Sequence, residues 1–101
     1  MTYKLDSNHN EIVLIAQQLG IKIVDNAMVK RQEPGQLDVW FGITNAETGA
    51  GVWVWVEIKT VTGNIRPSQQ ESINDCQVRG LPQAVVRTVD DVLMLFEKYC
   101  K

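Results

Sequence analysis

Long hydrophobic runs and cysteine pairs are missing from this sequence of 101 residues. Even its longest apolar stretches, such as Val52 to Val56, which ends at Glu57, are far shorter than the roughly 20 residues that a membrane-spanning helix needs. The two cysteines, Cys76 and Cys100, are too few for a disulfide framework and lack the paired spacing of a zinc site. We therefore expect reduced thiols and a soluble, cytoplasmic protein.

The sequence also has no excess of basic residues. Ten Lys and Arg stand against twelve Asp and Glu, a net charge of −2, so the chain as a whole lacks the positive charge that is typical of nucleic-acid-binding proteins. Any site for a polyanion must be local. With 45% hydrophobic and 22% charged residues, the composition is that of an ordinary globular protein, and the length fits a single domain over residues 1–101.

Hydrophobic periodicity predicts helices that alternate with short strands. Capping residues, helical spacing and glycine stops predict three helices, over Ser7–Leu19, from Ser68 to Gly80, and from Thr88 onward. The middle helix is expected to start with a capping box in which Ser68 caps the amide of Glu71. Runs rich in β-formers predict strands over Ile21–Val24, Leu37–Ile43, Val52–Thr60 and Gln83–Thr88, with Val29–Gly35 an edge strand or a loop.

Two connections fix the expected topology. Turn formers between Thr44 and Gly51 predict that strands Leu37–Ile43 and Val52–Thr60 pair as a hairpin. A crossover helix then joins Val52–Thr60 to a parallel strand, Gln83–Thr88. The sequence therefore predicts a small α/β fold with a mixed sheet flanked by helices.

Charged residues occur on strands that are otherwise apolar. Alternation places Leu37, Val39, Phe41 and Ile43 on one face, and Asp38 and Trp40 on the other. On the next strand, Val52, Val54, Val56 and Ile58 share a face, while Trp53, Trp55, Glu57 and Lys59 point the other way. Ionised groups on a covered sheet are costly unless they are paired or used. In a hairpin, Asp38, Glu57 and Lys59 converge at one end of the sheet.

Two converging carboxylates predict a bound cation. They repel each other, and a divalent ion relieves that repulsion at neutral pH. Oxygen ligands favour Mg²⁺ or Mn²⁺, which would keep positions open for water and a phosphate oxygen. Lys59 on the same face could orient that water and offset negative charge in the transition state. The chemistry that this suggests is phosphodiester hydrolysis.

Simpler interpretations stay open for several of these residues. Glu57 and Lys59 could form an exposed ion pair at a strand end, and Asp38 could be a turn residue. The three tryptophans could stack on nucleobases, but aromatic residues on strands under helices are more typical of a core, which is where we expect them. His9 is expected at the surface and Cys76 in the core.

Four segments resemble the VRR-NUC (virus-type replication-repair nuclease) domain of the PD-(D/E)XK metal-dependent nucleases. They are Val56–Thr60, Gly63–Gln69, Gly80 and Ala84–Asp91, in the order and spacing of that family. The resemblance covers most of the chain and implies a restriction-endonuclease-like αβββαβ(α) core. One departure is Leu37, where the family commonly has proline before the first aspartate.

The resemblance also implies roles for individual residues. Asp38 and Glu57 would be metal ligands for Mg²⁺ or Mn²⁺, with the backbone carbonyl of Ile58 as a further ligand. Lys59 would be the catalytic lysine and Gln69 the glutamine of the extended motif. Glu11 is included as a further carboxylate near the metal. Arg66, Lys30 and Arg31 flank the expected cleft and are candidate phosphate contacts, although each also fits a solvated surface charge.

The function that the resemblance implies is a metal-dependent DNA endonuclease selective for branched DNA such as four-way junctions. It would act in repair or recombination in a bacterial or phage-infected cell. A homodimer would suit the two-fold symmetry of such a substrate. Two alternatives stay open: a non-catalytic nucleic-acid or protein binding module that keeps the nuclease fold, and a nuclease directed by a replication or repair partner.

Overall fold

The computed structural model describes residues 7–26 and 37–101. Their helices and strands follow the order α1 (His9–Gln18), β1 (Lys22–Asp25), β2 (Val39–Thr44), β3 (Gly51–Ile58), α2 (Pro67–Arg79), β4 (Gln83–Val86) and α3 (Val89–Cys100). The predicted small α/β fold is confirmed. The strand or loop predicted over residues 29–35 lies outside the described residues, and so do Lys30 and Arg31.

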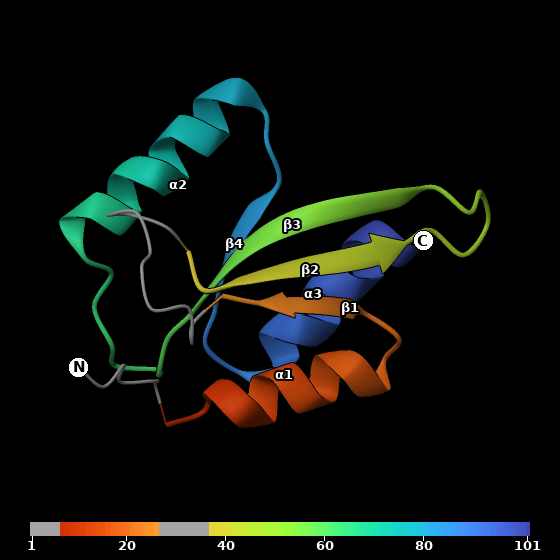
Figure 1. The fold of residues 1–101 in the computed structure, drawn as a ribbon, viewed down its shortest axis with the longest axis horizontal. Helices are drawn as coiled ribbons and strands as arrows, with labels where there is room; N and C mark the ends of the chain where they lie inside the picture. The colour runs from red at the N-terminus through yellow and green to blue at the C-terminus, as the bar shows by residue number, and fades with distance from the viewer. Residues whose placement is uncertain (1–6, 27–36) are drawn as a thin grey trace.

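The described strands form one mixed sheet in the order β1-β2-β3-β4 (Figure 1). β1 and β2 pair antiparallel, β2 and β3 form the predicted antiparallel hairpin, and β3 and β4 pair in parallel across the connection through α2. In the hairpin, Val39 is opposite Val56 and Trp40 is opposite Trp55. With this register, successive side chains of β2 and β3 point to opposite faces of the sheet, as the alternation in the sequence predicts.

One face of the sheet carries the hydrophobic core. Most of the apolar residues predicted to share this face are buried: Val39, Phe41, Ile43, Val54, Val56 and Ile58. Ile12 and Ala16 of α1 and Val92 of α3 complete the cluster. Figure 1 shows α1 and α3 together on one side of the sheet and α2 apart from them. None of the helices in the described segments is long and apolar enough to cross a membrane.

The prediction that α2 begins with a capping box at Ser68 is wrong. The helix starts at Pro67, and its N-cap is Arg66, whose backbone is extended (φ −70°, ψ 151°). A proline favours an extended residue before it, and its own fixed φ suits the first helical position, so Pro67 rather than Ser68 sets the start. The Arg66 amide donates to Gln69 Oε1 at 3.1 Å. The predicted stop at Gly80 is confirmed by its left-handed conformation (φ 71°).

α3 begins where the sequence predicts. Thr88 is the N-cap, and its hydroxyl accepts from the Asp91 amide at 3.2 Å, while Asp91 Oδ2 accepts from the Thr88 amide at 3.1 Å. This reciprocal pair satisfies two amides that a helix start leaves open. The same Asp91 oxygen also accepts from the Arg87 amide at 2.8 Å, which ties the end of β4 to α3.

Candidate active site

Glu57 is a buried carboxylate near the end of β3, on the face opposite the core. It is 1% exposed. Its Oε2 accepts from Gln69 Nε2 of α2 at 2.9 Å and lies 3.6 Å from Lys59 Nζ. Its Oε1 is also buried and has no hydrogen-bond partner among the residues that the structure describes. Buried carboxylate oxygens are rarely left in this state without a ligand, so Oε1 marks a position where a positive group would bind favourably.

Asp38 lies beside Glu57, as predicted. It directly precedes β2, and its Oδ2 accepts from the Ile58 amide of β3 at 3.3 Å. The two carboxylates are close enough for the charge of Asp38 to affect the ionisation of Glu57. Burial, and then the charge of Asp38, raise the pKa of Glu57 from 4.5 to about 7, against the opposing charges of Lys59 and Arg66. At neutral pH, binding of a proton or a cation at Glu57 is therefore favourable.

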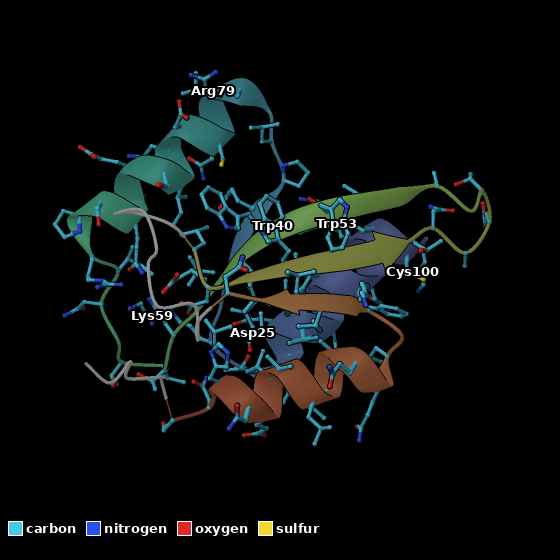
Figure 2. All side chains as sticks on the ribbon, viewed as in Figure 1. Asp25, Trp40, Trp53, Lys59, Arg79 and Cys100 are labelled. Atoms are coloured by element: carbon cyan, nitrogen blue, oxygen red, sulfur yellow. The ribbon has the colours of Figure 1, made fainter. Side chains whose placement is uncertain are left out.

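Lys59 directly follows β3, and its side chain is 14% exposed. Figure 2 shows it at the left end of the sheet, with Trp40 and Trp53 further along the strands. Hydrogen bonds fix its backbone: the Lys59 amide donates to the Val86 carbonyl at 3.0 Å, and Asn8 Nδ2 donates to the Lys59 carbonyl at 3.1 Å. These bonds hold the backbone from which the Lys59 ammonium approaches Glu57.

Two residues that position the site were missed from the sequence. Asn8 is the N-cap of α1, but its side chain makes no capping bond and instead donates to the carbonyls of Lys59 and Arg87. Arg87 Nη1 donates to the carbonyls of Thr60 at 2.6 Å and Gly63 at 2.7 Å. These bonds hold the segment that connects Lys59 to α2. Arg87 lies in a segment that carries the family resemblance, whereas no local signal marks the role of Asn8.

The structure places the other predicted site residues, Glu11, Arg66 and Gln69, at different distances from the carboxylates. Glu11 is exposed in the first turn of α1, and no three His, Cys, Asp or Glu side chains within residues 7–26 and 37–101 group so as to hold a metal ion. The structure therefore gives Glu11 no support as a further carboxylate. Arg66 is exposed at the start of α2 but close enough to lower the pKa of Glu57. Gln69 is buried and contacts Glu57 directly.

Two predictions are wrong: that His9 lies at the surface and that the tryptophans belong to the core. His9 is buried rather than at the surface, because its Nε2 pairs with Asp25 Oδ2 of β1 at 2.9 Å. The tryptophans are not core residues: Trp53 is 50% exposed, and Trp40 and Trp55 are partly exposed and stack on each other. They stay open because α2 contacts the sheet at its edge strand β4. Cys76 is buried as predicted.

No family model matches this chain, and no curated protein or solved structure is found to be similar to it.

Proposed function

We propose that this chain is a metal-dependent DNA endonuclease with a restriction-endonuclease-like core. The observation that carries the proposal is the buried carboxylate of Glu57, which lies beside Asp38 and Lys59 and keeps one oxygen without a hydrogen-bond partner in the described part of the chain. The order of helices and strands agrees with the αβββαβ(α) core that the sequence resemblance implies.

The donor set fits Mg²⁺ or Mn²⁺. Asp38 and Glu57 supply carboxylate oxygens, the Ile58 carbonyl is the further ligand implied by the resemblance, and hard cations of this kind prefer oxygen ligands. Glu57 Oε1 is the orphaned atom that such an ion would satisfy. When bound there, the ion would supply positive charge to a phosphate and lower the pKa of a coordinated water.

The chain's own residues would do the remaining work. Gln69 donates to Glu57 Oε2 and so leaves Oε1 as the carboxylate oxygen available to a ligand. Lys59, 3.6 Å from that carboxylate, would orient the attacking water and offset the charge that develops on the phosphate. In the reaction the attacking water gives up a proton to solvent as its oxygen bonds to phosphorus, one bridging P–O bond breaks, and the departing oxygen takes up a proton from solvent.

Branched DNA is the substrate that we propose, with a homodimer as the active form. A chain with a net charge of −2 has little general attraction for a duplex, so recognition must come from local contacts such as Arg66 and from the shape of the DNA. Two copies related by a two-fold axis would present two sites to a four-way junction. A replication or repair protein is a further partner that this proposal accommodates.

Cleavage of labelled DNA tests the proposal. Four-way junction, flap, single-stranded and linear duplex substrates would be incubated with Mg²⁺, Mn²⁺ or EDTA. We expect cutting that requires the metal and falls at least about 100-fold in Lys59→Ala and Asp38→Asn, in line with the loss of a transition-state contact. Lys98→Ala, an exposed lysine on α3, is the matched control. A folded wild type that binds DNA but cuts none of these substrates would favour the non-catalytic binding module instead.

A further inference from the structure

All three tryptophans of the chain lie on the same face of the sheet as the two carboxylates. Trp40 follows Asp38 by two residues on β2, and Trp55 precedes Glu57 by two residues on β3. Trp40 and Trp55 are opposite each other in the hairpin. Two residues of a strand span about 7 Å. The aromatic pair is therefore the next layer of side chains on this face, directly beside the candidate active site.

The three indole rings, which we call the tryptophan surface, are open to ligands. Trp40 and Trp55 stack with ring centroids 5.5 Å apart and planes 9° apart. Trp53 is half exposed and lies across Gly42 of β2, where an added Cβ would come within 2.9 Å of the ring. Figure 2 shows Trp40 and Trp53 side by side along the strands. The glycine thus makes room for an exposed aromatic ring.

Two hollows adjoin these rings. A groove of about 380 Å³ separates the three tryptophans from Ser72 and Cys76 of α2. A second hollow of about 300 Å³ lies between Trp40, Trp53 and Val24. Both are lined mainly by apolar and aromatic side chains, so a flat apolar group would fit against the rings.

Unsatisfied polar atoms distinguish this face from a finished core. Within the part of the chain that the structure describes, three buried side-chain atoms have no hydrogen-bond partner, and two of them are Trp55 Nε1 and Glu57 Oε1. Buried polar groups in protein cores are nearly always satisfied. The two atoms lie in adjacent layers of side chains on the same face of the sheet. A ligand that reaches both layers would supply the hydrogen-bond partners that these atoms lack.

We infer that the tryptophan surface stacks an unpaired nucleobase next to the phosphate that is cut. This inference rests on the proposed nuclease function and narrows its substrate class to strands with unpaired bases at the cleavage point. The offset of about 7 Å between the carboxylates and the aromatic pair is within the reach of a single nucleotide from its phosphate to its base. A base attached near the bound phosphate would therefore reach the rings.

Base pairing decides which DNA can use this surface. Bases within a duplex are already stacked on each other, whereas an unpaired base at a flap or a junction offers a free aromatic face to tryptophan. A second copy of the chain is the other candidate occupant. A protein seated on the groove would cover the adjoining carboxylates and close the site to substrate, so the observations favour the nucleobase.

Tryptophan fluorescence measures this contact directly, because all three tryptophans report from the surface in question. The full chain would be titrated in EDTA with single-stranded oligothymidylate and with a blunt duplex of equal length. We expect saturable quenching by the single strand and little by the duplex. Trp53→Ala should weaken single-strand binding about tenfold, the size expected for one stacked base, and Trp53→Phe should restore most of it. Met94→Ala, an exposed apolar residue on α3, should bind as wild type.

Several outcomes would overturn the inference: equal quenching by both DNAs, no binding, or a Trp53→Ala variant that binds single strands like wild type. Fluorescence that changes with protein concentration alone, together with a dimer lost in Trp53→Ala, would assign the groove to a second copy. Binding in EDTA is independent of cutting. Quenching without metal-dependent cleavage would therefore reject the nuclease and keep the stacking, whereas Lys59-dependent cleavage unchanged by Trp53→Ala would do the reverse.

Discussion

Alternate residues of the same two strands form the two faces of the β2–β3 hairpin, yet the two faces differ in burial and polarity. Towards α1 and α3, Phe41 and Val54 are fully buried among other apolar side chains. Towards α2, the same strands carry a buried carboxylate with an unpartnered oxygen and tryptophans that are partly open to solvent. One face gains stability from burial, whereas the other keeps groups in costly states that a ligand would relieve.

This difference supports the proposed site without reference to any relative. A buried ionisable group with a displaced pKa indicates a functional site more strongly when its surroundings also leave polar atoms unsatisfied. Both conditions hold at Glu57, and neither holds at the apolar residues on the core face of the same strands. Substitutions on the two faces should therefore change different quantities.

The largest effect is expected on the core face. Phe41→Ala should lower the free energy of unfolding by about 3–5 kcal/mol, because it removes a fully buried ring and leaves a cavity. Trp53→Ala, on the other face and half exposed, should cost about 1 kcal/mol or less. Urea unfolding of both variants measures the contrast. Equal losses would mean that the tryptophan surface is a second core after all.

Glu57→Gln should stabilise the protein at alkaline pH. The folded-state pKa of Glu57 lies above its ordinary value, so the folded chain holds this proton more tightly than the unfolded chain does, and the wild type loses stability as the pH rises from about 4.5 to about 7. Glutamine carries no charge and keeps an oxygen for Gln69. The variant should therefore gain on the order of 3 kcal/mol near pH 8 in EDTA and nothing near pH 4.

Unfolding curves at both pH values check this prediction. The matched control is Glu11→Gln, which removes an exposed carboxylate of α1 and should show no such dependence. If Glu57→Gln were less stable than the wild type near pH 8, then the carboxylate would be serving the fold, and its place in a ligand site would lose its main support.

The smallest effect concerns the segment between β3 and α2. Arg87→Lys should lose at least one of the bonds to the Thr60 and Gly63 carbonyls, at a cost of about 1 kcal/mol in stability. Because these bonds hold the backbone next to Lys59, cleavage should fall by more than the stability change explains. Rates measured well below the unfolding temperature separate the two effects, and an unchanged rate would show that Arg87 supports only the fold.

The sequence predicted what short-range patterns determine. Strand alternation placed Asp38 and Glu57 on the face away from Val39 and Val56, and Gly80 marked the end of α2. The hairpin then brought the carboxylates together because its register follows from the same alternation. How much of the outer face α2 covers is not a property of strand period, so the exposure of the tryptophans could not be read from it.

Long-range contacts account for the other differences. His9 is buried because Asp25 of β1 pairs with it, and Asn8 reaches carbonyls of Lys59 and Arg87 that are far away in the chain. Nothing within a few residues of either side chain signals these partners. The start of α2 does have a local signal, because Pro67 suits the first helical position better than Ser68 suits the cap.

Binding of Mn²⁺ to the purified chain tests the central claim most directly, that Asp38 and Glu57 form a divalent-cation site. Electron paramagnetic resonance counts free Mn²⁺ during a titration at neutral pH, without DNA. We predict a saturable site that Mg²⁺ displaces, that is lost in Asp38→Asn and Glu57→Gln, and that is retained in Glu11→Gln. Binding that is absent from the folded wild type, or that survives in Glu57→Gln, would contradict the account.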